Sequence, residues 1–142
     1  MTAPAWMNAV IGEFGRSAGL GGLALNERGA AALRFETGSA LRLEYTGEEL
    51  VVAMTVPASA AALKRLLSLS HPMARHGFRI RTGRLRKTGE FIMAVRLAER
   101  DVTLPQLNAA FAALWRLAGE IGGAAWACTS HGRPTRCAST SA

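Results

Sequence analysis

The sequence predicts an α+β domain in which helices cover an antiparallel sheet, with the element order αβββαββα. Two observations lead to this prediction. Hydrophobic residues repeat with the period of a helix near both ends and near the middle of the chain, and with the period of a strand in between. The segments with strand periodicity are joined by short turns that contain glycine, which favours antiparallel neighbours. The length of 142 residues is typical of a single domain with a sizeable core.

The first helix is expected over residues 5–18. Its apolar positions recur at offsets that place them on one helical face: Met7, Val10, Ile11, Phe14 and Ala18. Gly19 and the pair Gly21–Gly22 end this helix. The same glycines loosely match a phosphate-binding loop, but such a loop follows a strand and opens a helix. We therefore interpret them as a helix terminus.

Three strands are predicted next, over residues 31–35, 41–45 and 50–56. Apolar and polar side chains alternate along the first two, as they do when one face of a sheet is buried. The third is almost wholly apolar, which indicates a more buried strand. Together they predict an antiparallel meander.

A second helix follows Pro57, with Ser59 as the N-cap residue and a stop or kink at Pro72. Its apolar side is formed by Leu63, Leu66 and Leu67. Two further strands are expected at residues 78–85 and 91–98, separated by a loop at residues 86–90.

The last helix has the clearest pattern. Thr103 and Gln106 form a capping-box sequence, in which each side chain can accept from the other residue's backbone N–H. An apolar seam then runs to Ile121. Beyond it, residues 122–142 are rich in Gly, Ala, Ser and Thr, with Arg133 and Arg136 and no acid. We predict a domain over residues 1–121 and a flexible basic C-terminal tail over 122–142.

Composition excludes several classes of function. The net charge is +7, and Asp101 is the single aspartate, so chemistry built on aspartate clusters has little to work with. The longest apolar runs are far too short to span a bilayer, and the basic start of a secretory signal is missing. Both cysteines, Cys128 and Cys137, lie near the C-terminus, which excludes a disulfide framework for the core. A cytoplasmic protein without cofactors is the simplest interpretation.

Candidate catalytic or metal-binding residues are few. His71 and His76 flank Pro72 without a cysteine or acid nearby, so we interpret them as solvated imidazoles at a helix end. A metal site built from Cys128, His131 and Cys137 lacks a fourth ligand and a standard spacing. The sequence therefore predicts a protein that is neither an enzyme nor a metalloprotein.

The basic residues cluster. Six bases and no acid lie between Arg75 and Lys87. A basic patch on the fourth strand and its loop is predicted from Arg79, Arg81, Arg84, Arg86 and Lys87. Such a patch is compatible with nucleic-acid binding, which we keep as the alternative function. The competing interpretation is a solvated strand face whose arginines pair with neighbouring acids.

Particular segments resemble a known family. The segment Glu99–Leu107, with the sequence ERDVTLPQL, is very similar to the start of the last helix in the SycN-like branch of the class I type III secretion chaperones. The strand segments Leu41–Glu44, Leu50–Ala53 and Phe91–Leu97 fit the same family, whose fold is CesT/SycE-like. The resemblance covers about Trp6 to Ile121.

This resemblance implies a small cytoplasmic dimer that binds the N-terminal, non-globular segment of a secreted effector or gatekeeper protein. The dimer is either a homodimer or a heterodimer with a second small chaperone, and it has no cofactor. Many family members are acidic, whereas this chain is basic. Cargo-binding candidates by position are Trp6, Phe14, Leu41, Leu43 and Tyr45. Dimer-interface candidates are Leu63, Leu66, Phe78 and Ile80. For each of these residues an ordinary place in the core is the competing interpretation.

Overall fold

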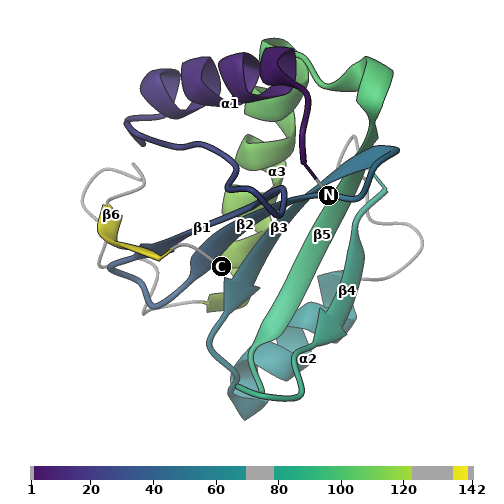
Figure 1. Ribbon diagram of the computed structural model, residues 1–142. Coiled ribbons are helices and arrows are strands. Elements are labelled where there is room, and N and C mark those ends of the chain that lie inside the picture. The colour runs from purple at the N-terminus through teal and green to yellow at the C-terminus, as the bar shows by residue number, and fades with distance from the viewer. Residues whose placement is uncertain (1, 70–78, 123–135, 141–142) are drawn as a thin grey trace.

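The computed structural model describes residues 2–69, 79–122 and 136–140 (Figure 1). Its helices are α1 (Ala5–Ser17), α2 (Ala60–Leu69) and α3 (Leu104–Gly122), with a short 3-10 turn, η1 (Glu99–Asp101). Its strands are β1 (Ala30–Phe35), β2 (Ala40–Tyr45), β3 (Glu49–Val56), β4 (Arg81–Arg84), β5 (Phe91–Ala98) and β6 (Arg136–Thr140). The predicted α+β class and the order of the first eight helices and strands are confirmed.

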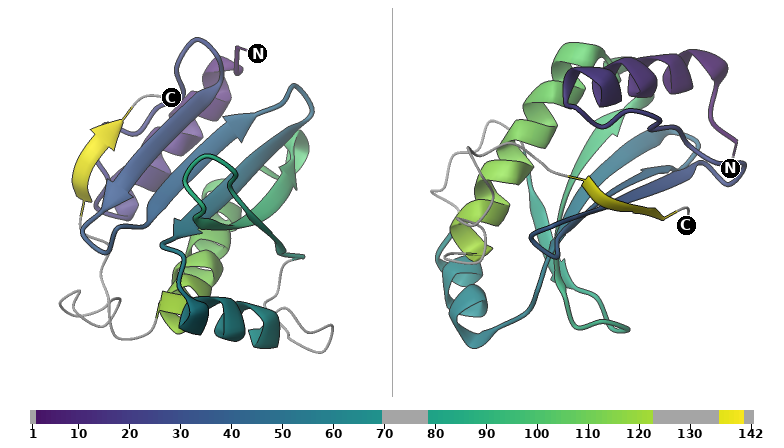
Figure 2. Two further views of the ribbon diagram at one scale, coloured as in Figure 1. Left: turned by 90° about the horizontal axis from the view of Figure 1, so that it is seen from below. Right: turned by 90° about the vertical axis from the view of Figure 1, so that its left-hand side faces the viewer.

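The strands form one antiparallel sheet in the order β4-β5-β3-β2-β1-β6. The predicted meander is present as β1, β2 and β3, in which Leu33 lies opposite Leu41 and Leu43 opposite Val52. All three helices lie on one side of the sheet (Figure 2). Helix α3 packs against β3 and β5, and both α1 and α2 pack against α3.

The core lies between the sheet and these helices. Buried residues alternate along β1, β2 and β5, as the period-two pattern predicts. At one end an aromatic cluster joins α1, β1 and α3: the Phe14 and Phe111 rings lie 5.6 Å apart, and the Phe35 and Trp115 rings 5.2 Å apart. Edge-to-face pairs of this kind add to the stabilisation from burial itself.

The predicted helix starts are present. The Ser59 hydroxyl accepts a hydrogen bond from the Ala62 amide at 3.0 Å, as an N-cap serine does. The Thr103 hydroxyl accepts from the Gln106 amide at 3.4 Å, which is the hydroxyl half of the predicted capping box. These caps set where α2 and α3 begin against the sheet.

Two differences from the sequence prediction stand out. Strand β4 covers only four residues of the predicted 78–85, and Phe78 lies outside the described residues. No strand was predicted for Arg136–Thr140, in the segment predicted as a flexible basic tail; it pairs with β1 as strand β6. Strand β1 would otherwise expose a row of unpaired backbone groups, which any extended segment can satisfy. Residues 123–135, with Cys128 and His131, lie outside the described residues, as do His71 and His76.

Within the described part of the chain, no helix is long and apolar enough to cross a bilayer.

Candidate functional site

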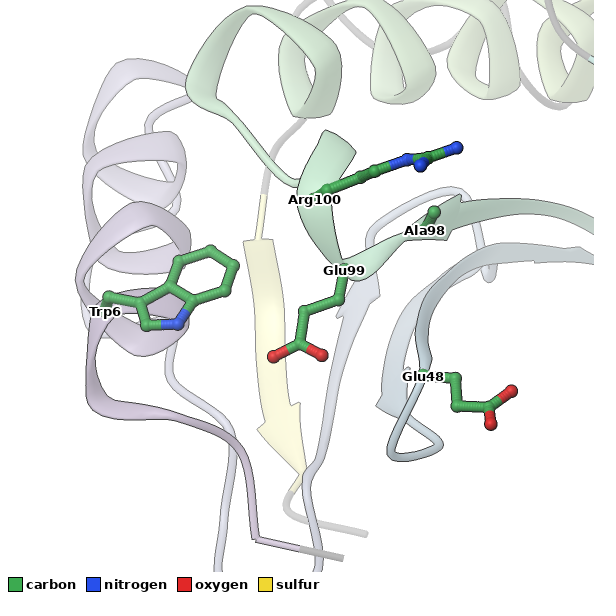
Figure 3. A pocket seen from close by; sticks show the side chains of 5 residues that line it. All are labelled: Trp6, Glu48, Ala98, Glu99 and Arg100. Atoms are coloured by element: carbon green, nitrogen blue, oxygen red, sulfur yellow. The ribbon is translucent and has the colours of Figure 1, made fainter.

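A pocket of about 510 Å³ opens where the N-terminal end of α1 faces one end of the sheet. Its lining comes from four elements: Trp6 of α1, Glu48 of the β2–β3 turn, Ala98 at the end of β5, and Glu99 and Arg100 of η1 (Figure 3). The indole forms one wall of the pocket and the η1 turn forms the facing wall. The pocket thus combines an aromatic surface with charged groups.

The packing of α1 explains why the Trp6 side chain is exposed to solvent. The stripe formed by Met7, Ile11 and Phe14 is fully buried, and it turns the neighbouring position outward. Trp6 is 46% exposed, which makes it one of only three large hydrophobic residues that are exposed among those described. Among the five cargo-binding candidates, Trp6 is therefore the exposed one.

The opposite wall is held by a backbone contact. The Glu99 amide donates a hydrogen bond to the Glu48 carbonyl at 3.0 Å, so the β2–β3 turn and η1 are joined. Gly47, in the same turn, has a φ of 103°, a conformation that favours glycine. The two glutamates are 51 positions apart in the sequence, and this contact brings their backbones together.

The Glu99 carboxylate at the pocket affects the pKa of Tyr45. Burial raises the pKa of the Tyr45 phenol above its ordinary value, and the adjacent Glu99 carboxylate raises it further. The hydroxyl of Tyr45 donates to the Gly47 carbonyl at 3.0 Å. In Figure 3 the Glu99 carboxylate points toward the indole, whereas Glu48 and Arg100 point away from it. The pocket therefore offers one apolar face and one acceptor group to a ligand that lies between them.

The other cargo-binding candidates are placed differently. Phe14, Leu41 and Leu43 are at most 2% exposed, and Tyr45 is 6% exposed. All four belong to the hydrophobic core, which favours the competing interpretation for them. Tyr45 is linked to the pocket through Glu99 and through its hydrogen bond to Gly47, in the turn that carries Glu48.

A second surface is formed by the exposed side of α2. Leu63 is 43% exposed and Leu67 is 67% exposed, whereas Leu66 is buried in the core and Ile80 packs against it half-buried. Leu67 was missing from the predicted interface residues, although its spacing of four from Leu63 places both on one helical face. Two adjacent exposed leucines on a short helix form an apolar surface available to a partner.

All five residues of the predicted basic patch are exposed: Arg79, Arg81, Arg84, Arg86 and Lys87. Every residue of β4 is exposed, and β4 is an edge strand of the sheet. The Arg84 guanidinium lies 6.0 Å from the centroid of the Phe91 ring, and its Nε donates to the Gly89 carbonyl at 3.2 Å. The expected pairing of these arginines with neighbouring acids is not seen in the described residues, where the ion pair is Arg96 with Glu49 at 3.3 Å.

Comparison with known proteins places the chain in a family. The model of the family described as type III secretory system chaperone SycN matches residues 6–122. A comparison with curated protein sequences found no match.

Several solved structures share the fold. A chain of the ExsC–ExsE complex has a TM-score of 0.69 at 23% identity, over 86% of this chain and 95% of that one. The type III secretion chaperone SycH of Yersinia pestis, crystallised with a stable fragment of YscM2, has a TM-score of 0.57 at 18% identity, over 81% and 98%. The heterodimeric ExoU–SpcU complex of the Pseudomonas aeruginosa type III secretion system gives 0.56 at 15% identity, over 81% and 93%. At these identities the likeness establishes the fold.

Proposed function

The chain belongs to the SycN family of type III secretory system chaperones, and from this premise we propose that it binds a secreted protein in the cytoplasm before export. The bound part is the N-terminal, non-globular segment of an effector or gatekeeper protein, which the chaperone keeps soluble and competent for export. The family match over residues 6–122 carries this proposal, because it spans every element from α1 to α3. The proposal assigns no catalytic role to the chain.

The physical basis is the binding of an extended polypeptide. A non-globular segment can pair its backbone with an exposed sheet edge and place alternate side chains in apolar pockets. Strand β4 supplies a fully exposed edge. Ordering such a segment costs a few kcal/mol or more, so binding requires a large contact surface.

We assign the Trp6 pocket to this cargo. A half-exposed indole beside a carboxylate acceptor is typical of an anchor position, since tryptophan buries a large area on binding at a low cost in side-chain entropy. Trp6 remains a cargo-binding residue in this proposal, with Glu99 as its polar neighbour. The core positions Phe14, Leu41 and Leu43 are buried and are not assigned to cargo.

We assign the exposed surface of α2 to dimerisation. Leu63 and Leu67 supply exposed apolar area there. The half-buried Ile80 stays an interface candidate, and Phe78, the other candidate from the sequence, lies outside the described residues. A dimer built on this surface repeats the cargo pocket and doubles the surface that an extended segment can wrap.

Retention of cargo tests the proposal. The full chain is co-expressed with the N-terminal segments of secreted proteins encoded beside it, purified through a tag, and weighed by size exclusion with light scattering. We expect a chaperone dimer that carries one cargo segment. The Trp6→Ala variant should lose affinity about tenfold or more, because a central tryptophan contributes on the order of 2 kcal/mol.

Glu13→Ala is the matched control, because Glu13 is exposed on the same helix and does not line the pocket. Equal loss of affinity in both variants would count against the pocket. A folded chain that retains none of these segments would overturn the function itself.

A further inference from the structure

The C-terminal strand β6 extends the sheet beyond the part of the chain that the family match covers. The match ends at residue 122, whereas β6 is formed by Arg136–Thr140. Because the strand order is β4-β5-β3-β2-β1-β6, the matched part of the sheet ends at β1. Figure 2 shows β6, in yellow, running along β1 in both views. The chain therefore provides a partner for its own β1 edge.

The pairing between β1 and β6 is short and irregular. Arg34 lies opposite Ala138, but the next residue of β1, Phe35, lies opposite Arg136. Cys137 is thus the extra residue of a bulge, and a bulge interrupts the ladder of backbone hydrogen bonds. Fewer bonds therefore hold β6 than a regular strand of the same length would make.

The sequence of β6 also provides little apolar area for burial. Its five residues read RCAST and include no large apolar residue. By contrast, Leu33 and Phe35 of β1 are buried in the core. Since stabilisation grows with the apolar area removed from water, β6 gains little beyond its backbone pairing. An extended segment with large apolar residues at alternate positions could form the same backbone bonds and gain burial as well.

We propose that Arg136–Thr140 is a resident strand, which occupies the β1 edge until an extended segment of the bound protein displaces it. The partner that fits is a polypeptide whose apolar and polar residues alternate, because successive side chains of a strand face opposite sides of the sheet. Without cargo, the resident strand keeps the edge from pairing with other chains. The inference rests on the proposed function, because the displacing segment belongs to the cargo.

Prolines in β6 should open the edge in the full-length chain. Ala138→Pro and Ser139→Pro are combined, because alternate N–H groups of a strand point to the same neighbour, so one of the two faces β1. The matched control exchanges these residues, Ala138→Ser with Ser139→Ala, and keeps both N–H groups. We expect the proline variant to bind the N-terminal segments of the secreted proteins about fivefold more tightly, because a competitor lowers the apparent affinity by the fraction of molecules whose edge is free. The control should bind as the wild type does.

A disulfide between the two strands should close the edge. Ala32 and Thr140 lie opposite each other, and a disulfide can span opposite residues of antiparallel strands. Ala32→Cys and Thr140→Cys are made in a full-length chain with Cys128→Ser and Cys137→Ser, so that no native thiol competes. The oxidised form should bind the segments about tenfold or more weakly than the reduced form. A pair that stays reduced under oxidising conditions would contradict the register of β6 and overturn the inference.

A synthetic peptide tests the edge without cargo. It has the sequence of residues 134–142 with Thr140→Cys and Cys137→Ser, and it is added to the proline variant that also carries Ala32→Cys and lacks the native thiols. Disulfide trapping should be about tenfold faster than with a peptide that has Arg136→Cys instead, because only the first peptide brings its thiol opposite position 32. Equal trapping rates for the two peptides would overturn the inference.

These measurements separate the two proposals. Trapping that depends on register, in a chain that retains none of the secreted segments, refutes the proposed function alone. Retention that neither the prolines nor the disulfide changes refutes this inference alone.

Discussion

At the scale of single residues, Gly15 shows how a missing side chain sets the path of the chain after α1. A Cβ atom at this position would lie 2.6 Å from the Leu20 carbonyl oxygen and 2.9 Å from the Leu23 Cβ. The segment that follows the helix therefore packs directly against its last turns. Leu20 and Leu23 become core residues through this close approach.

Replacing Gly15 by alanine should lower the free energy of unfolding by about 1–3 kcal/mol, because the added methyl overlaps backbone atoms that cannot move independently. Gly12→Ala is the control on the same helix. A Cβ there meets only the end of the Arg16 side chain at 3.6 Å, so this change should stabilise the helix by about 0.5–1 kcal/mol. Urea unfolding of both variants measures the difference. Equal effects would contradict the close packing at Gly15.

Tyr45 is the only tyrosine in the chain, so its ionisation can be followed directly by tyrosinate absorbance. Burial and the Glu99 carboxylate raise its pKa, so its midpoint should lie above the ordinary value of about 10. Glu99→Gln should move the midpoint down, whereas the exposed control Glu44→Gln should move it less. Because the phenol releases its proton more readily in the unfolded chain, the fold should lose stability as pH rises above about 10. An unchanged midpoint in Glu99→Gln would contradict the proximity of the two groups.

At the scale of elements, α2 divides its leucines between the core and the solvent. Ala62 and Leu66 are buried, while Leu63 and Leu67 are exposed. Periodicity predicted the helix, but it assigned Leu63, Leu66 and Leu67 to one apolar side. The exposed pair can be recognised only once α3 is seen to cover one side of the helix.

Leu67→Asp should weaken dimerisation about tenfold or more, because it places a charge at the centre of the proposed interface. Its effect on folding should stay within about 0.5 kcal/mol, since the side chain is already 67% exposed. Ser68→Asp introduces the same charge at the next exposed position and should leave dimerisation intact. Sedimentation equilibrium measures both variants. Loss of the dimer in Ser68→Asp alone would place the interface elsewhere.

Much of the fold could be predicted from the periodicity of apolar residues, because the patterns in α1, β1–β3, β5 and α3 reflect which face each element buries. Two parts of the fold could not be predicted in this way. Leu20, Leu23 and Leu25 enter the core from a glycine-rich segment without a regular period. Strand β6 pairs through its backbone, which leaves no side-chain pattern to detect.

The candidate site was predictable only in part. Trp6 could be recognised in the sequence because it precedes the apolar helix positions Met7, Ile11 and Phe14. Glu48 and Glu99 gave no signal, since the contact between the β2–β3 turn and the end of β5 depends on the order of strands in the sheet.

At the scale of the whole molecule, the described core lies within the span of the family match. Among the residues whose burial the structure describes, the core runs from Ala3 to Ile121, and the family match ends at residue 122. Strand β6 adds backbone pairing at the β1 edge, opposite the β4 edge of the sheet.

Removing residues 123–142 should therefore leave a folded protein, with a loss of about 1 kcal/mol from the short edge strand and a fall in thermal midpoint of a few degrees. Circular dichroism measures the midpoint, and cargo retention by the shortened chain serves as a functional control. Loss of cooperative unfolding would contradict this view of the core.

The basic patch on β4 and its loop also has a kinetic consequence. Together with the exposed bases of α2, it places positive charge at the end of the molecule opposite α1 (Figure 1). An acidic partner attracts this end, so the molecule turns it toward the partner before contact. Encounter would then be steered rather than random, with association rates that fall steeply as ionic strength rises while dissociation stays nearly constant.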